Sequence, residues 1–418
     1  MKVFKFGGAS IKNAKAVRNM SEIIEKHRNE RLIVVVSAMG KTTNAIEEIA
    51  GLCFHRKNFQ DKLEALKTYH FTMIDELFSD SREIVKKASR LFDQLVQNLE
   101  KGDEYDRLYD QTVSFGELLS STIISGYLNE AGIHTTWVDA RELIKTDDHF
   151  RQANVDWTRT EELIAEFVPA LFENGILLTQ GYIGGTPDHL TTTLGREGSD
   201  FSAAIFASSL NADSVTVWKD VPGILNADPK LIEEAELFHE LAYKEAAEMT
   251  YYGASVIHPK TIKPLANKNI PLYVRSFYRH EEPGTVIHQC ETNEQMPAII
   301  IKNNQCLLSF KVMDYSFVNE DNLSVIFREL ATADLRINIM QNSAISFSIV
   351  LDNDLGKVEN VIDNLKDDFR IWYNTGLQLI TIRNYTQDLI NKYRGDRRIL
   401  LEQISRSNYR ALLAGENT

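Results

Sequence analysis

The chain begins MKVFKFGGASIKN (Met1–Asn13), a short apolar stretch that contains a lysine and ends at two glycines. Residues 2–6 are typical of a strand, and the pattern after the glycines is typical of a helix. A lysine inside an apolar strand is costly unless its ammonium meets a partner. Glycines let backbone N–H groups approach an anion, and a helix start adds positive potential. Lys5, Gly7 and Gly8 therefore predict a phosphate site, although an edge-strand lysine that reaches solvent would explain the pattern as well.

Strand-like and helix-like segments alternate along the first two thirds of the chain. The run RLIVVVSAM (Arg31–Met39) is continuously apolar, as expected of a strand buried on both faces. Further strands are expected at 134–140, 175–181, 214–220 and 271–277. Helices are expected at 13–28, within 43–97, and at 115–131, 158–174 and 199–210. This alternation predicts an α/β layer sandwich with a mainly parallel sheet.

The character of the chain changes at residues 281–296, which are polar and rich in turn-forming residues. The order expected after them, β-α-β-β-α-β, is that of a ferredoxin-like unit. A last segment has a β-α-β pattern only, so it is either truncated or takes strands from a neighbour. The expected parts are a catalytic domain at 1–285, a linker at 286–298, a ferredoxin-like domain at 299–376 and a short second copy at 377–418.

Composition limits the possible partners. A length of 418 residues predicts two or three domains. The formal net charge of −13 disfavours nucleic acid and anionic membranes, which bind through basic patches. Cys53, Cys290 and Cys306 are scattered and form no CxxC pair, so we expect no disulfide framework, no zinc knuckle and no metal ligands in the protein. No stretch approaches a signal peptide or a membrane span, and a reducing cytoplasm is the expected location.

A second glycine-containing stretch, TTTLGREGSDFSAA (Thr191–Ala204), places Arg196 between two glycines at a helix start. Ser199 or Asp200 would be expected there as a helix cap in any case. The arginine adds a different property, because a planar guanidinium can hold a carboxylate with two hydrogen bonds. Since ligands of α/β sheets bind at the carboxyl ends of strands, we favour a binding role.

Three further stretches place polar residues at strand or helix ends. WKDVPGILNADPK (Trp218–Lys230) ends a strand at Asp220 and contains two strong turn signals. Turns alone would explain it, but Asp220 could also face a nucleotide or its metal. VSAMGKTTN and SFGELLS offer Ser37, Thr43 and Glu117 for a polar ligand, although helix capping explains each of them taken singly.

Taken together, these stretches resemble the aspartate kinases of the amino acid kinase family. KFGGAS resembles their KFGG[TS]S opening, SAMGKTTN their SAxxxxTN element, and SFGELLS their GE-containing helix. LGREGSDFSAA is similar to LGRxGSD, WKDVPGILNADPK to WTDVxGVYTxDPR, and YYGASVIHPKTI to YxGAKVLHPRT. The C-terminal part resembles their ACT regulatory domains. The resemblance covers nearly the whole chain, with the motifs in the same order.

The resemblance implies a carbamate-kinase-like layer sandwich in which MgATP phosphorylates the side-chain carboxylate of L-aspartate, the first step toward lysine, threonine and methionine. It implies Lys5 and Asp200 as catalytic residues. The ATP-binding residues that it implies are Lys5, Gly7, Gly8, Ser10, Lys219, Asp220, Leu225 and Lys230. The aspartate-binding residues that it implies are Ser37, Ala38, Thr43, Glu117, Arg196, Gly198, Ser199 and Asp200. The acceptor carboxylate, with an ordinary pKa of about 3.9, needs no general base.

Three positions depart from the family pattern. Ser255 replaces a lysine that is implied to contact ATP, and Lys219 replaces a threonine and could return a cation from another direction. Leu225 replaces a tyrosine near the nucleotide. Two other functions stay open: a different amino acid kinase (acetylglutamate, glutamate or uridylate kinase), and an inactive kinase that serves as an amino-acid sensor.

Regulation follows from the ACT resemblance. QNSAISFS is similar to a stretch of threonine- or lysine-sensing members, so Gln341, Asn342 and Ser343 are expected to bind one of these amino acids. A simple polar turn would also explain these three residues. ACT domains commonly pair across subunits, and a homodimer is the expected assembly.

Overall fold

The computed structural model describes residues 1–102, 104–172, 175–195, 197–254, 257–291, 296–313 and 316–415. The chain divides into two compact units. The first contains Met1–Ile224, Leu237–Thr250 and Ser255–Thr292, and the second contains Leu225–Glu236, Tyr251–Ala254 and Asn293–Thr418. Within the described ranges, the helices are all too short or too polar to cross a membrane.

The described residues of the first unit form an eight-stranded sheet in the order β3-β4-β2-β1-β7-β9-β10-β8. Neighbouring strands from β3 to β9 are parallel, β10 is antiparallel to β9, and β8 is parallel to β10. The mainly parallel α/β sheet is confirmed. The strands are β1 (Lys2–Phe6), β2 (Leu32–Val36), β3 (Thr135–Val138), β4 (Ile176–Gln180), β7 (Ser214–Lys219), β8 (Glu240–Ala242), β9 (Leu272–Ser276) and β10 (Thr285–His288). A separate small hairpin consists of β5 (Ile183–Gly185) and β6 (Thr191–Thr193).

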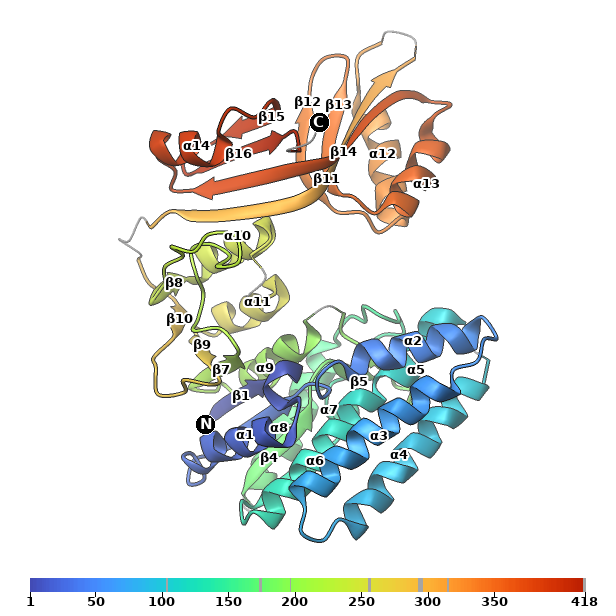
Figure 1. Ribbon diagram of the computed structural model, residues 1–418, viewed down its shortest axis with the longest axis vertical. Coiled ribbons are helices and arrows are strands. Elements are labelled where there is room, and N and C mark those ends of the chain that lie inside the picture. Colours follow the sequence, from blue (N-terminus) through green and yellow to red (C-terminus); the bar gives the residue numbers. More distant parts are fainter. Residues whose placement is uncertain are drawn as a thin grey trace. The chain divides into compact units, whose positions relative to one another are not determined.

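Helices connect these strands. The expected helical stretch 43–97 consists of α2, α3 and α4, of which α3 packs against α4 and α4 packs against α6 (Figure 1). The helices are η1 (Gly8–Ile11, a 3-10 helix), α1 (Ala14–Glu25), α2 (Thr42–Phe54), α3 (Gln60–Leu77), α4 (Arg82–Glu100), α5 (Tyr105–Val113), α6 (Phe115–Glu130), α7 (Ala140–Leu143), α8 (Trp157–Leu171), α9 (Gly198–Ser209), α10 (Tyr243–Tyr252) and α11 (Pro259–Asn267). The all-round apolar character of α9 reflects its place in the core, because almost every one of its residues is buried.

The described part of the second unit contains a six-stranded antiparallel sheet in the order β12-β13-β11-β14-β16-β15. Its elements are β11 (Ala298–Val312), α12 (Glu320–Thr332), β12 (Ile337–Asn342), β13 (Phe347–Asp352), α13 (Leu355–Leu365), β14 (Phe369–Arg383), α14 (Gln387–Arg394), β15 (Ile399–Ile404) and β16 (Asn408–Leu413). The order from β11 to β14 is the expected ferredoxin-like β-α-β-β-α-β. Its core joins α12 and α13 to one face of the sheet.

The expectation of a bare β-α-β pattern after residue 377 was wrong. The strand β15 was missed, and a further strand comes from the same chain, because the start of β11 pairs with the end of β14. These two 15-residue strands run side by side through both halves of the sheet (Figure 1). Register shifts between Lys302 and Leu307 divide the ladder where one half passes into the other. Sequence periodicity alone does not reveal that one strand serves two packing units.

Candidate active site

Lys5 lies in the middle of the large sheet. Its strand β1 pairs with β2 on one side and with β7 on the other, which places Lys5 opposite Val35 and Val217. Only 7% of the residue is exposed. The edge-strand alternative is therefore wrong, because β1 has a neighbour on both sides and the side chain is buried.

The Lys5 ammonium forms an ion pair with Asp200, in the first turn of α9. Nζ of Lys5 lies 2.7 Å from Oδ1 of Asp200, and Nζ of Lys219 lies 3.5 Å from Oδ2. Burial favours a raised pKa for Asp200, but the positive charges of Lys5 and Lys219 outweigh it and lower the pKa. The carboxylate is therefore ionised at neutral pH and is held between two ammonium groups from β1 and β7.

This cluster has more positive than negative charge. Among the described residues, two ammonium groups pair with the Asp200 carboxylate, whose side chain is only 2% exposed. The N-terminus of the 12-residue helix α9 adds its partial positive charge at the same place. Such an arrangement attracts anions, and partial exclusion of water strengthens the attraction. The geometry is suited to phosphate groups or carboxylates.

The glycine loop after β1 packs closely against the loop after β2. A Cβ atom on Gly8 would lie 2.6 Å from the carbonyl oxygen of Ala38 and 2.9 Å from that of Gly40. The N–H of Gly40 donates to the Gly8 carbonyl at 3.0 Å. On the other side, the buried Ser10 hydroxyl donates to the carbonyl of Trp218 at 3.3 Å. Gly8 is thus required for contact between two backbone segments, a reason that sequence inspection did not provide.

Gly7 leaves space beside the Lys5 ammonium. A Cβ atom on Gly7 would lie 3.4 Å from Nζ of Lys5, so this side of the ammonium faces backbone with no side chain. Gly7 therefore lies beside the Lys5 ammonium, whereas Gly8 packs against the loop after β2.

Glu117 is a buried carboxyl group on α6. The N–H of Ala38 donates to its Oε1 at 3.3 Å, and only 2% of the residue is exposed. Its Oε2 has no hydrogen-bond partner among the described residues. Burial raises the pKa of Glu117 to about 8. Hydrogen bonds from the backbone N–H groups of Ala38 and Glu117 favour the ionised form but only partly offset this rise. A buried carboxyl with one unused oxygen is suited to receive a cationic group from a ligand.

A hydrogen bond fixes α6, and hence Glu117, to the end of β2. The Ser120 hydroxyl donates to the carbonyl of Ser37, which joins α6 to the end of β2. Ser37 and Thr43, the other small polar residues expected to bind the substrate, are each half-buried near the two ends of the loop that contains Ala38. The structure thus brings Ser37, Ala38 and Glu117 together.

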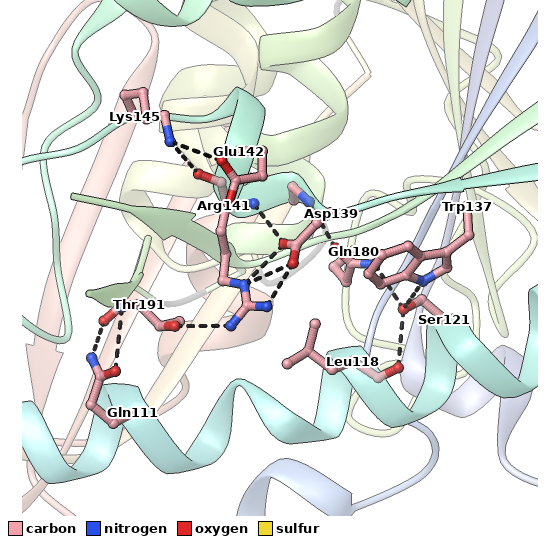
Figure 2. Close-up of polar contacts among 11 residues, drawn as sticks. Gln111, Leu118, Ser121, Trp137, Asp139, Arg141, Glu142, Lys145, Gln180 and Thr191 are labelled. Atoms are coloured by element: carbon pink, nitrogen blue, oxygen red, sulfur yellow. Dashed lines mark hydrogen bonds and ion pairs between the residues drawn. The ribbon is translucent and has the colours of Figure 1, made fainter. Parts of the chain in front are cut away.

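A polar network anchors the far side of α6 (Figure 2). Nε2 of Gln180 donates to the Ser121 hydroxyl at 2.8 Å, Nε1 of Trp137 donates to the same oxygen at 3.0 Å, and that hydroxyl donates to the Leu118 carbonyl at 3.2 Å. The side-chain oxygen of Gln180 also accepts from the N–H of Ala140 at 2.8 Å. The network ties α6 to β3, β4 and α7, so it positions the helix that contains Glu117.

The same figure shows how the β5–β6 hairpin is held (Figure 2). Arg141 pairs with Asp139 at 2.6 Å and donates to the Thr191 hydroxyl at 3.2 Å. Nε2 of Gln111 donates to the Thr191 carbonyl at 2.6 Å. These contacts fix the strand that leads into the second glycine stretch.

The start of α9 packs tightly on the loop after β4. A Cβ atom on Gly181 would lie 2.5 Å from the Cβ of Ser199, and one on Gly198 would lie 2.8 Å from the Tyr182 ring. Gly198 and Ser199 are buried, beside Asp200. Arg196 lies outside the described residues, so its expected role stays a prediction.

Sequence inspection missed a buried carboxyl that supports this region. Asp110 accepts hydrogen bonds at 2.8 Å from both the N–H and the hydroxyl of Thr193, and one at 2.9 Å from the N–H of Arg151. Burial raises the pKa of Asp110 to about 6, despite these hydrogen bonds. Its neighbours in sequence contain no signal for this role, because all three donors come from distant residues.

The remaining predicted residues are Asp220, which follows Lys219 of the cluster, and residues that belong to the second unit or lie outside the described ranges. Asp220 is exposed directly after β7. Leu225 and the exposed Lys230 belong to the second unit, and Ser255 lies outside the described residues. Gln341, Asn342 and Ser343 are exposed at the end of β12 and the turn that follows.

Comparisons with known proteins identify the family of this chain. Residues 1–276 match the amino acid kinase family. Lysine-sensitive aspartokinase 3 of Escherichia coli (strain K12) is 33% identical over 356 residues, which cover 84% of this chain and 78% of that protein. A second relative is the chloroplastic bifunctional aspartokinase/homoserine dehydrogenase 2 of Arabidopsis thaliana, which is 34% identical over 297 residues. The match covers 69% of this chain but only 32% of that protein.

Solved structures extend the similarity to the whole chain. The crystal structure of E. coli aspartokinase III in complex with aspartate and ADP (R-state) matches with a TM-score of 0.86 and 28% identity, covering 100% of this chain and 97% of that one. The same enzyme in complex with lysine and aspartate (T-state) matches with a TM-score of 0.82 and 28% identity, covering 100% and 96%. The chain therefore belongs to the amino acid kinase family and, within it, to the aspartokinases.

Proposed function

We propose that this protein uses MgATP to phosphorylate the side-chain carboxylate of L-aspartate, which yields 4-phospho-L-aspartate and begins the synthesis of lysine, threonine and methionine. The observation that supports this most strongly is the Lys5–Asp200–Lys219 cluster, which offers excess positive charge at the centre of the sheet. The reaction joins two anions, so the protein must supply cations more than acid–base groups.

Electrostatics define the difficulty and the solution. Two unit negative charges about 4 Å apart repel by roughly 4 kcal/mol at an effective dielectric constant near 20. Lys5 and Lys219 offset this repulsion where the transferred phosphoryl group meets the acceptor, and Asp200 holds both ammonium groups in place. Because Asp200 is ionised and buried, both lysines stay oriented when the ligands leave. Lys5 and Asp200 are thus the proposed catalytic pair.

Aspartate is proposed to bind near Glu117. The α-ammonium of aspartate is its only cationic group, and Oε2 of Glu117 is a buried acceptor with no partner in the described ranges. Arg196 is proposed to hold a substrate carboxylate. The other proposed contacts are Ser37, Ala38, Thr43, Gly198, Ser199 and Asp200.

The nucleotide is proposed to bind along the glycine loop. Gly7 lies beside the Lys5 ammonium, where the terminal phosphates would lie. The remaining proposed contacts in the first unit are Ser10, Lys219 and Asp220.

Magnesium is proposed to arrive with the nucleotide. Mg²⁺ prefers oxygen ligands and is usually bound through one or two carboxylates together with substrate phosphates. Both oxygens of Asp200 are paired with lysines, whereas Asp220 is an exposed carboxylate next to Lys219, so Asp220 would hold the ion. When bound, Mg²⁺ neutralises charge on the phosphate oxygens.

An aspartate-hydroxamate assay with MgATP tests the activity directly. We expect hydroxamate to form with aspartate and not with acetylglutamate or glutamate as acceptors, and we expect no release of ADP with UMP, whose phosphorylation would give no hydroxamate. No product with any acceptor, together with retained amino-acid binding, would instead support the sensor alternative.

Feedback control by lysine is proposed from the similarity to the lysine-sensitive relative. Gln341, Asn342 and Ser343 present exposed polar groups around one turn, and the Ser343 N–H is already bonded to the Ser346 carbonyl at 2.8 Å. The Gln341→Ala variant should lose inhibition and keep its uninhibited rate. Repeating the hydroxamate assay with lysine and with threonine identifies the effector, and unchanged inhibition would remove Gln341 from the site.

A homodimer through the second unit is also proposed. Large apolar side chains are exposed there, with 50% of Trp372, 59% of Tyr373 and 61% of Ile404 accessible. Light scattering should give twice the chain mass, and Trp372→Glu should lower the measured mass.

We also propose that the chain divides into parts at 1–285, 286–298, 299–376 and 377–418. Limited proteolysis should cut first within 286–298.

A further inference from the structure

Three side chains with metal-binding atoms meet at the edge of the large sheet. The edge strand β8 pairs in parallel with β10, with Glu240 opposite Val286 and Ala242 opposite His288. Because side chains alternate along a strand, Glu240 and His288 project from the same face. Cys290 follows His288 by two residues. The carboxylate of Glu240, a ring nitrogen of His288 and Sγ of Cys290 all lie within 4.8 Å of one another.

We propose that Glu240, His288 and Cys290 bind a divalent cation of the zinc class, with water in the fourth position. A thiolate, an imidazole and a carboxylate are the ligand types that zinc accepts, whereas Mg²⁺ and Ca²⁺ prefer oxygen alone. A tetrahedral zinc centre has its ligand atoms about 3.3 to 3.8 Å apart, given bonds of about 2.0 to 2.3 Å. The three ligand atoms, all within 4.8 Å of one another, are therefore at separations comparable with those of such a centre.

Charge also favours a cation at this place. One thiolate and one carboxylate balance the two charges of the metal, and the neutral imidazole completes the set. Nε2 of His288 already pairs with the Glu240 carboxylate, so two of the three ligands point toward one place. Metal binding must displace the proton of the Cys290 thiol, so it should tighten as pH rises.

The site would stabilise the edge of the first unit. Glu240 and His288 are 48 residues apart, so a shared metal would fasten the three-residue strand β8 to β10. The lack of CxxC pairs led to the expectation that no protein residue binds a metal. A CxxC pair detects only ligands that are close in sequence. Here the pairing of β8 with β10 brings Glu240 to His288 and Cys290.

Cobalt titration of the full-length protein tests the proposal. The protein is treated with chelator, transferred to buffer containing Mg²⁺ to occupy oxygen-only sites, and titrated with Co²⁺. We expect one equivalent to produce the thiolate charge-transfer band and the visible bands of tetrahedral cobalt, and zinc to displace it. Cys290→Ser should remove the charge-transfer band, and both it and His288→Gln should weaken zinc binding at least tenfold.

Cys53→Ser is the matched control, because the Cys53 thiol donates to the Leu99 carbonyl at 3.3 Å and lies outside the cluster. This variant should bind cobalt as the unsubstituted protein does, and zinc should raise the thermal midpoint of both by several degrees. Circular dichroism verifies that each variant is folded. The proposal is overturned if the unsubstituted protein binds cobalt no more tightly than Cys290→Ser, or if the zinc-dependent thermal shift persists in that variant.

Discussion

Replacing Glu117 with glutamine should stabilise the ligand-free protein and abolish aspartate binding. A carboxyl in the unfolded chain titrates near 4.5, whereas burial raises the pKa of Glu117 to about 8 in the folded protein. Between these pH values the folded state keeps a proton that the unfolded state has released. Stability therefore falls as pH rises through this window.

The magnitude follows from the difference in pKa. Each unit corresponds to about 1.4 kcal/mol, so the penalty grows from about 1 kcal/mol at pH 5 to about 4 kcal/mol at pH 8. Glutamine has nearly the same shape and cannot ionise, so it removes this penalty. Burying the glutamine amide without a hydrogen-bond partner costs about as much free energy as burying the protonated carboxyl. This cost should depend little on pH. The stability difference between Glu117→Gln and the unsubstituted protein should therefore grow by about 3 kcal/mol from pH 5 to pH 8.

Urea unfolding at several pH values, followed by circular dichroism, measures this difference. Glu22→Gln, at an exposed position of α1, is the control and should change stability by only a few tenths of a kcal/mol. Calorimetry should detect no aspartate binding to Glu117→Gln. A stability difference that stays constant from pH 5 to pH 8 would refute the assignment of a buried, neutral carboxyl.

Three further predictions concern the same site. Aspartate binding at pH 7 should release close to one proton, because the substrate ammonium favours ionised Glu117; calorimetry in buffers of different ionisation enthalpy counts it, and zero release would contradict the pairing. Lys5→Ala should lower kcat by about 100- to 1,000-fold with little change in aspartate affinity, because the lost charge acts on the transition state; a defect in KM alone would argue against this role. Ser121→Ala should destabilise the protein by about 1–3 kcal/mol, because Gln180 loses a buried hydrogen-bond acceptor, and thermal melts check this.

The sequence anticipated the general architecture well. Alternating strand and helix patterns predicted the mainly parallel sheet, and the β-α-β-β-α-β order predicted the ferredoxin-like unit. The stretch around Lys5, Gly7 and Gly8 predicted a phosphate site at the end of a strand, and the structure buries Lys5 there beside Gly7. These features are readable because they depend on local periodicity and on glycine at a close approach, both of which lie within a few adjacent residues.

Only the tertiary structure decided which groups meet. The strand order places β1 between β2 and β7, and this order alone brings Lys5 to Asp200 and Lys219, about two hundred positions later in the chain. Tertiary packing also buries Glu117 and thereby raises its pKa. In the C-terminal sheet, strand pairing lets β11 serve both halves. Local patterns record which residues share a face of one element, but pairing between elements depends on the packing of the whole core. For this protein, the sequence determined the kinds of groups at the site, and the fold determined their partners and their charge.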